Sequence, residues 1–297
     1  ASCRYNFIKK DGSRLSDVRY DQCSPFLDGV SRVRLHKNEW DIINKSGKSI
    51  LPHFFDYIDE FSEGLARVRL NHKHGFYNKH GEEVIPLVYS FAGSFSEGLV
   101  FVVNDKRYGF IDNNGNEVTK TYFQDAMSFS NGMAGVKLDW KWGFINSFGK
   151  VIIPCIYDQV YPFSEGLAKI KSNEKYGFID KEGANKISIF YDEAEFLSKG
   201  LIKVKLNYKY GYIDLNQKEI ISIKYEGTDS LSENLIKVKL NNKWGVLDLF
   251  GNFILPISFD EIDSFSEGLF LVSINEKWGY TDYYGRIAER KYNFRYE

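Results

Sequence analysis

Two series of acidic residues recur along this chain, and carboxylates are the side chains most often paired for general acid–base catalysis. One series lies in Phe-Ser-Glu-Gly segments, and the other follows an aromatic residue. A catalytic site is a single constellation, whereas these carboxylates return in most segments of the chain. We therefore expect structural roles, either accepting hydrogen bonds from turn amides or pairing with a basic series. The first acidic series is Glu63, Glu97, Glu165, Glu233 and Glu267, the second is Asp56, Asp158, Asp192 and Asp260, and the basic series is Arg67, Lys169, Lys203 and Lys237.

The histidines form no recognisable metal or catalytic motif. Three of the five, His72, His74 and His80, lie close together in the sequence, but a metal site needs ligands that converge with defined geometry. His74 occupies a position that is aromatic in other segments, so we expect it to be buried, whereas His72 and His80 fall at turn tips. We predict no metal, no cofactor and no catalytic residue, and hence that the protein is not an enzyme.

The acidic residues recur because the chain is an internal repeat. The glycine of the Phe-Ser-Glu-Gly segment returns after 35 residues once and then every 34, and three further ladders keep the same register. The first ladder is Gly29, Gly64, Gly98, Gly132, Gly166, Gly200, Asn234 and Gly268. The second contains Gly75, Gly109, Gly143, Gly177, Gly211, Gly245 and Gly279, the third includes Gly81, Gly115 and Gly149, and the fourth is aromatic, as at Phe55, Tyr89 and Phe123.

The pattern inside each repeat predicts strands. Its glycines and prolines would interrupt helices, which argues against a helical repeat of the same period. Residues 201–206 alternate apolar and lysine side chains, as a half-buried strand does. We predict three strands per repeat, at 65–70, 74–78 and 83–86 in the second one. Because Asn234 replaces a glycine of the first ladder, we expect positive φ there, and at the second ladder we expect a close backbone approach.

These residues resemble the WG repeat family of bacteria. The resemblance is carried by Lys141-Trp142-Gly143-Phe144-Ile145, by the segments that begin at Lys243 and Lys277, and by the Phe-Ser-Glu-Gly-Leu segments. It covers about residues 4–290, with Tyr or His in place of Trp in several repeats, and it implies a β-repeat array while implying no activity. We expect structural roles for the family's Trp and Gly positions, among them Trp142, Trp244, Trp278, Gly166 and Gly177.

We predict an all-β fold, an open superhelical solenoid of about eight 34-residue, three-stranded hairpin repeats. Residues 1–297 would form one elongated array, with 1–29 as a partial N-terminal cap repeat, 30–285 as tandem repeats and 286–297 as a C-terminal cap. The strand that precedes the WG position is missing from the first unit. The other two kinds of strand are therefore in surplus at the N-terminal end, which favours an open array. A closed propeller-like ring, which needs equal numbers of each strand, is the alternative.

Charge and composition narrow the partners. The formal net charge of −1 argues against nucleic acid, and no apolar run is long enough to span a membrane. The opening Ala1-Ser2-Cys3 is similar to the end of a bacterial lipoprotein cleavage box, which suggests a lipid anchor at Cys3 and a cell-envelope or secreted location. A free thiol is the alternative, and pairing of Cys3 with Cys23 is another. With Cys155, the cysteines have the spacing of neither a metal motif nor a disulfide framework.

The positions where the repeats disagree predict a binding surface. The tip of the first hairpin varies through Asn38, His72, Lys106, Trp140, Glu174, Tyr208, Asn242 and Glu276, each but the first followed by Lys or Arg. Among these we select His72, Trp140 and Tyr208, and we add an apolar patch at Phe101 and Leu271, where other repeats carry Lys or Arg. Packing of that patch against an adjoining strand is the alternative. We expect a scaffold for protein–protein interaction, or alternatively a glycan or cell-wall binding module.

Overall fold

A computed structural model describes residues 4–197, 200–232, 234–284 and 286–288. The chain forms two compact units, residues 1–168 and 169–297, which are described separately. The described residues form strands and turns, and no α-helix occurs among them. Within this part of the chain, the structure contains no helix with the length and apolarity that a membrane crossing requires.

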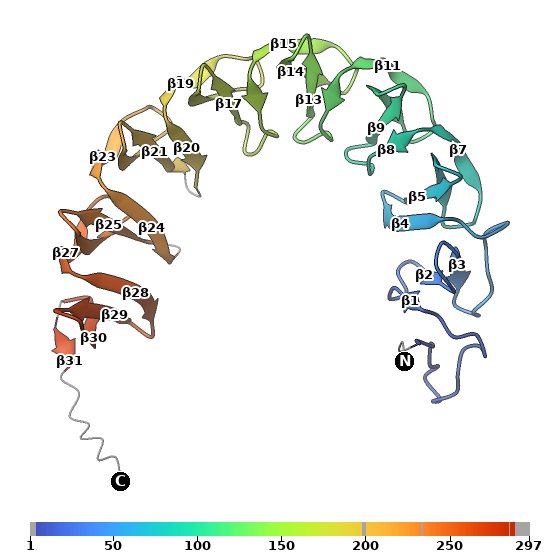
Figure 1. Ribbon diagram of the computed structural model, residues 1–297, viewed down its shortest axis with the longest axis horizontal. Coiled ribbons are helices and arrows are strands. Elements are labelled where there is room, and N and C mark those ends of the chain that lie inside the picture. The colour runs from blue at the N-terminus through green and yellow to red at the C-terminus, as the bar shows by residue number, and fades with distance from the viewer. Residues whose placement is uncertain (1–3, 198–199, 233, 285, 289–297) are drawn as a thin grey trace. The chain divides into compact units, whose positions relative to one another are not determined.

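The first unit contains one three-stranded sheet followed by four-stranded ones, all antiparallel (Figure 1). In each sheet the strands pair in chain order, so every sheet is a simple meander. The strands are β1 (Gln22–Cys23), β2 (Val30–Arg34) and β3 (Trp40–Asn44); β4 (Tyr57–Ser62), β5 (Leu65–Leu70), β6 (Lys73–Asn78) and β7 (Glu83–Tyr89); β8 (Phe91–Ala92), β9 (Leu99–Asn104), β10 (Arg107–Asp112) and β11 (Glu117–Phe123); β12 (Asp125–Ala126), β13 (Met133–Leu138), β14 (Lys141–Asn146) and β15 (Val151–Tyr157); and β16 (Gln159–Val160).

The second unit repeats the same meander, and its boundary falls within β17 (Ala168–Ser172). Its further strands are β18 (Lys175–Ile179) and β19 (Asn185–Tyr191); β20 (Glu193–Phe196), β21 (Ile202–Leu206), β22 (Lys209–Ile213) and β23 (Glu219–Tyr225); β24 (Gly227–Ser232), β25 (Leu235–Leu240), β26 (Lys243–Asp248) and β27 (Phe253–Phe259); and β28 (Glu261–Ser266), β29 (Leu269–Ile274), β30 (Lys277–Asp282) and β31 (Ile287–Ala288). The prediction of one continuous array over 1–297 stays a prediction.

The all-β repeat is confirmed, but the expectation of three strands per repeat is wrong. The three expected strands are present, and a fourth precedes them, such as β8, whose Phe91 and Ala92 pair with Val103 and Val102. This strand covers only two residues in β8, β12 and β16. A strand that short carries too little alternation for sequence periodicity to detect it.

The first residues form an irregular start to the array. Between residues 4 and 21 the chain makes isolated bridges, Tyr5 with Tyr20 and Ile8 with Arg14, and then enters β1. The partial cap repeat expected over residues 1–29 stays a prediction. The C-terminal segment expected to act as a cap lies outside the described residues from position 289 onward.

The second glycine ladder lies where two strands approach too closely for a side chain. In β14, a Cβ built on Gly143 would lie 2.4 Å from the carbonyl oxygen of Ile153 and 2.7 Å from the amide nitrogen of Cys155. The pairing of β14 with β15 shifts register on either side of Phe144, and this bulge brings the two backbones together. Gly75 and Gly177 meet the next strand in the same way, which confirms the expected close approach.

The first glycine ladder serves the turns. Gly64, Gly98, Gly132, Gly166 and Gly268 have φ between 78° and 84°, and no atom lies within 4 Å of the Cβ position of any of them. Glycine is used here because L side chains are disfavoured in this left-handed region, and the close approach seen at Gly143 plays no part. The expected positive φ is therefore confirmed for these glycines.

The apolar core lies between successive sheets. One cluster joins Leu65, Phe76 and Ile85 of one sheet to Ala92, Phe95, Val100, Val102 and Ile111 of the next. In two of the Phe-Ser-Glu-Gly segments the phenylalanine packs edge-on against a phenylalanine of the preceding repeat, with ring centroids 4.9 Å apart for Phe76 and Phe95 and 4.8 Å apart for Phe144 and Phe163. A single sheet therefore cannot bury its own core, and neighbouring repeats stabilise each other.

Hydrogen bonds from the same segment also connect successive repeats. Ser96 Oγ donates to the carbonyl oxygen of Phe129 at 2.8 Å, and Glu97 Oε2 accepts from the amide of Gly132 at 2.8 Å. Glu63 accepts in the same way from Gly98. Glu63 and Glu97 of the first acidic series therefore accept hydrogen bonds from turn amides, one of the two expected roles, and those amides belong to the next repeat.

Candidate functional site

Three of the candidate residues, His72, Trp140 and Tyr208, lie at the tips of two-residue hairpins between the second and third strands of four-stranded sheets. Both central residues of these two-residue turns have positive φ, for example 48° and 65° at Asp139 and Trp140, and 50° and 64° at Asn207 and Tyr208. This is the geometry of a type I′ turn, which matches the twist of the strands and favours Asn or Asp followed by Gly. The variable position is therefore one where a bulky side chain is strained.

Trp140 and Tyr208 project into solvent from these strained positions. Their exposed fractions are 76% and 86%. A tryptophan or tyrosine with φ near 65° is an outlier, and such strain concentrates at functional sites. His72 occupies the same turn position, with φ 62°, and is also exposed.

The second acidic series holds the tips in place. Asp192 Oδ2 accepts from the amide of Asn207 at 2.7 Å, while its Oδ1 accepts from Nζ of Lys175. Asp260 makes the same pair of bonds, to Asn275 and Lys243. The bond to Lys175 has the largest effect in lowering the pKa of the Asp192 carboxyl below its usual value, and the bond from the Asn207 amide lowers it further. These bonds explain why a basic residue follows most of the tips.

The pairing expected between the acidic and basic series is wrong in its partners. The guanidinium of Arg67 binds the carboxylate of Asp59, and Lys203 and Lys237 face Glu195 and Asp229. Arg67 also donates to the carbonyl oxygen of Ala92 in the next sheet. Asp59, Glu195 and Asp229 lie on β4, β20 and β24, each the first strand of its sheet. Because that strand was not predicted, its carboxylates could not be assigned.

A glycine at a tip is expected to stabilise the protein. Tyr208→Gly removes an exposed ring and relieves a left-handed residue, so we expect the free energy of unfolding to rise by about 0.5–1 kcal/mol. Asn242→Gly is the matched control at another tip, and its gain is expected to be smaller because asparagine tolerates this region. Urea denaturation followed by tryptophan fluorescence measures both. A loss of stability in Tyr208→Gly would show that the ring supports the fold.

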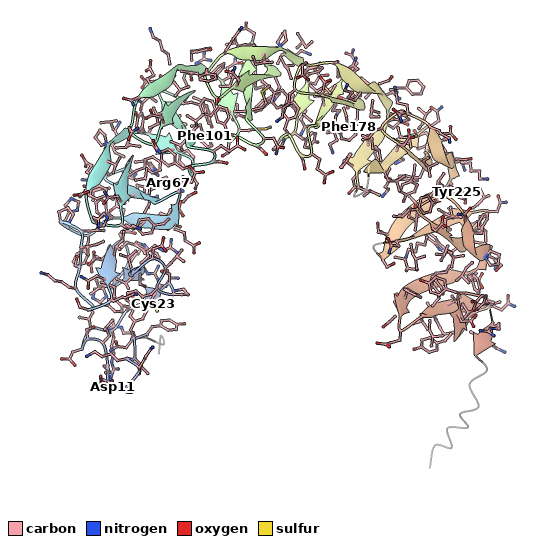
Figure 2. The ribbon with its side chains drawn as sticks, turned by 180° about the vertical axis from the view of Figure 1, so that it is seen from behind. Asp11, Cys23, Arg67, Phe101, Phe178 and Tyr225 are labelled. Atoms are coloured by element: carbon pink, nitrogen blue, oxygen red, sulfur yellow. The ribbon has the colours of Figure 1, made fainter. Side chains whose placement is uncertain are left out.

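The predicted apolar patch is only partly accessible. Phe101 is half-buried between Phe91 and Tyr108, with ring centroids 6.2 and 5.6 Å away (Figure 2). Leu271 is also half-buried and pairs with Tyr280 across β29 and β30. The alternative of packing against an adjoining strand therefore describes Phe101 better than an exposed patch does.

A second row of exposed aromatic residues was missed by the sequence reasoning. Phe148, Phe250 and Tyr284 each lie more than four-fifths exposed in the turn that leads to the last strand of a sheet. Phe148 donates its backbone amide to Asn146 Oδ1 at 3.1 Å, in a turn whose frame is Asn or Asp. The same comparison between repeats would have found them, because this turn position varies freely while the Asn or Asp two residues before it and the Gly after it are nearly constant.

The expected structural tryptophans differ in their surroundings. Trp142 is buried, Trp244 is half-buried, and Trp278, in the last described sheet, is half exposed. Lysines of the neighbouring strand lie close to Trp142 and Trp244, with Lys237 Nζ 5.1 Å from the centroid of Trp244. Burial therefore supports the predicted structural role less for Trp278 than for Trp142 and Trp244.

The described part of the chain holds all five histidines and two of the three cysteines. No three His, Cys, Asp or Glu side chains among these residues converge as metal ligands. Cys23 and Cys155 are half-buried, and burial raises the pKa of both thiols, which keeps them protonated and weakly reactive. Cys3, with its expected lipid anchor or disulfide, lies outside the described residues.

A family model for the WG containing repeat matches seven consecutive segments, at residues 42–73, 75–108, 108–142, 142–176, 176–210, 210–244 and 244–278. The family was expected from the Trp-Gly and Phe-Ser-Glu-Gly residues, and the match confirms it. No curated protein matches the sequence.

Several solved structures are distantly similar. A eukaryotic initiation factor shares 11% identity with a TM-score of 0.43, covering 88% of this chain and 84% of its own. BamB from Moraxella catarrhalis shares 11% identity with a TM-score of 0.40, covering 84% of this chain and 92% of its own. The computationally designed Ika8 protein shares 10% identity with a TM-score of 0.37, covering 86% and 92%. Likeness at this level carries no conclusion about this chain.

Proposed function

This chain belongs to the family of WG containing repeat proteins, and from that premise we propose that it is a non-catalytic scaffold that binds a protein partner through its hairpin tips. The recurring carboxylates accept hydrogen bonds from backbone amides of the repeats, as Glu97 and Asp192 do. The exposed rings of Trp140 and Tyr208 have no comparable role in holding the sheets together.

One observation carries this proposal: large aromatic side chains occupy a strained turn position where glycine would be more stable. Selection for stability alone does not explain a tryptophan with φ 65° that is 76% exposed. Tryptophan and tyrosine supply large, rigid contact areas and are enriched at the energetic centres of protein interfaces. The array would present such anchors at intervals of whole repeats, so separate weak contacts would add by multivalency.

We propose further that the repeats continue as an open superhelical solenoid. The support is the count of predicted strands. The first unit lacks the strand that precedes the WG position, whereas a ring closed by strand exchange between its ends needs equal numbers of each kind of strand. Small-angle X-ray scattering of the purified protein tests this proposal. We expect the distance distribution of an elongated particle, whereas a compact ring-like profile would contradict it.

Partner capture tests the binding proposal. We expect the wild-type protein to retain a specific protein from extracts of its source cells, and the double variant Trp140→Ala, Tyr208→Ala to lose it. With the purified partner, the dissociation constant of the double variant should rise by about 30-fold or more, as expected for two interface aromatic anchors. The matched control is Lys106→Ala with Asn242→Ala, which changes the same turn position in two other repeats.

Each outcome has a defined meaning. Equal capture by both double variants would contradict the tips as the binding surface. If the wild type instead binds immobilised glycans, and loses them in the aromatic variant, the glycan-binding alternative replaces the protein scaffold. Unfolding of the aromatic variant, detected by circular dichroism, would show that these rings are part of the core.

A further inference from the structure

A cleft of about 280 Å³ lies in the second unit, between two successive repeats. Its walls are Tyr176 on β18 and Tyr210 on β22, and lysines of β17 and β21 lie beside these rings. The polar residues that line it are Lys169, Lys203, Lys205, Glu193 and Glu195. The hairpin tip at Tyr208 does not contribute to this lining.

The cations and carboxylates of the cleft differ in exposure. Lys205 Nζ lies 2.7 Å from Glu193, and its side chain is 21% exposed against 58% for the glutamate. Lys203 Nζ lies 3.9 Å from Glu195, with 26% exposure against 62%. The lysine side chains are therefore better covered by the protein than the carboxylates that they pair with. Ion pairs whose acid is this exposed contribute little to stability, so a ligand can replace the glutamate at small cost.

A third lysine, Lys169, adds positive charge to the cleft. Burial lowers the pKa of the Lys169 ammonium, and the nearby Glu195 opposes that shift only in part. An anion that entered the cleft would favour the charged form of this lysine and would form charge-assisted hydrogen bonds, which are stronger than neutral ones.

The tyrosine rings are poorly placed for stacking on a sugar. Lys169 and Lys171 place their Nζ atoms 5.6 and 5.5 Å from the centroid of Tyr176. Lys203 and Lys205 place theirs 5.6 and 5.0 Å from the centroid of Tyr210. Ammonium groups therefore already lie over both rings, and the cleft offers anion-binding groups more readily than an open aromatic face.

We propose that this cleft binds a carboxylate side chain from an acidic peptide segment, whose oxygen atoms replace those of Glu195 and Glu193 as partners of Lys203 and Lys205. The cleft is separate from the hairpin tips and adds a second, electrostatic contact. The inference rests on the proposed function in one respect, namely that the occupant belongs to a protein.

The experiment uses an amidated, fluorescein-labelled hexaglutamate peptide and measures its anisotropy with the full chain at low ionic strength. We expect saturable binding that weakens as salt is added, and no binding of the hexaglutamine peptide. Lys169→Gln should raise the dissociation constant about tenfold, the usual size of a charge-assisted hydrogen bond. Lys218→Gln, an exposed lysine of the same unit, removes the same charge outside the cleft and should change it less than twofold.

The glutamates of the cleft provide a test of opposite sign. Glu195→Gln removes the competing carboxylate, so it should tighten hexaglutamate binding about threefold, whereas the matched variant Glu182→Gln in an exposed turn should not. Loss of folding cannot produce tighter binding, so this result is specific. Equal effects of Lys169→Gln and Lys218→Gln, absence of saturable binding, or no tightening by Glu195→Gln would each overturn the proposal. Tighter binding of an oligoglucuronate than of hexaglutamate would overturn the peptide assignment.

Failure of the cleft and failure of the scaffold can be told apart. If the aromatic tip variant loses the cellular partner while hexaglutamate never binds, the proposed function stands and the cleft inference fails. If hexaglutamate binds with the expected variant pattern while the tip variant keeps its partner, the cleft stands and the tips are not the binding surface.

Discussion

Gly143→Ala is expected to destabilise the protein by about 3 kcal/mol or more, although it adds a single methyl group. The added Cβ would lie 2.4 Å from the carbonyl oxygen of Ile153, and the atoms that it meets belong to the backbone of the neighbouring strand. Backbone atoms cannot rotate away as the end of a flexible side chain can. The variant must therefore either separate β14 from β15 or disturb the bulge that joins them.

Gly166→Ala is the matched control for this variant. Gly166 has φ 81°, and no atom lies within 4 Å of its Cβ position, so the same substitution there costs only the left-handed conformation, about 1 kcal/mol. Chemical denaturation followed by tryptophan fluorescence compares the two, because Trp142 lies next to Gly143. A cost at Gly143 no larger than that at Gly166 would contradict the close approach.

The second large effect is a loss of stability between about pH 6.5 and pH 4 that comes from His74. This imidazole is only 8% exposed, its Nδ1 atom has no hydrogen-bond partner among the described residues, and it lies 5.3 Å from the ring of Phe91. Burial, followed by the charges of Arg67 and Arg69, lowers the pKa of His74 to about 4, while Asp59 opposes the shift.

The direction follows from the difference between the folded and unfolded states. The unfolded chain binds a proton at His74 near pH 6.5, whereas the folded chain binds it only near pH 4. The stability is therefore fully present above the unfolded pKa and is lost as the pH falls toward the folded one. At about 1.4 kcal/mol per pKa unit, the loss amounts to about 3 kcal/mol.

His74→Tyr should remove this loss, because tyrosine occupies the equivalent position at Tyr108, Tyr176 and Tyr210 and stays neutral over this range. Denaturant midpoints measured at half-unit pH intervals would show a flat profile down to about pH 4. Below that, both proteins should lose stability, because carboxyls with lowered pKa, such as Asp192 and Asp260, become protonated. An unchanged slope above pH 4 in His74→Tyr would place its origin elsewhere.

Much of the repeat frame could be predicted from the sequence because its causes are local. Gly166 and Gly143 belong to ladders that return every 34 residues, and each ladder reflects a backbone requirement that only glycine meets. The alternation in residues 201–206 predicts β21 because one face of that strand is buried and the other is not. The aromatic preference at position 74 predicts burial even where the residue is a histidine.

The features that the sequence did not predict depend on residues that are far apart along the chain. The hydrogen bonds from Ser96 to Phe129 and from Gly132 to Glu97 join positions 33 and 35 residues apart. Periodicity indicates that these residues matter but cannot show which group each one meets. The strand at Phe91–Ala92 exists only because β9 lies beside it, so its own two residues carry no signal.

The sequence by itself determined the repeat, its register, the all-β class, the membership of a WG family and the turn tips where the repeats differ. The tertiary structure alone decided which carboxylate each lysine meets, which rings stay exposed, and that the side chains of Lys203 and Lys205 are less exposed than those of Glu195 and Glu193. The physical reason is that turn geometry and strand alternation act between neighbours in sequence. Exposure is set by the packing of one sheet against the next, and the pairs of Lys203 with Glu195 and of Lys205 with Glu193 are set by the register of β20 against β21.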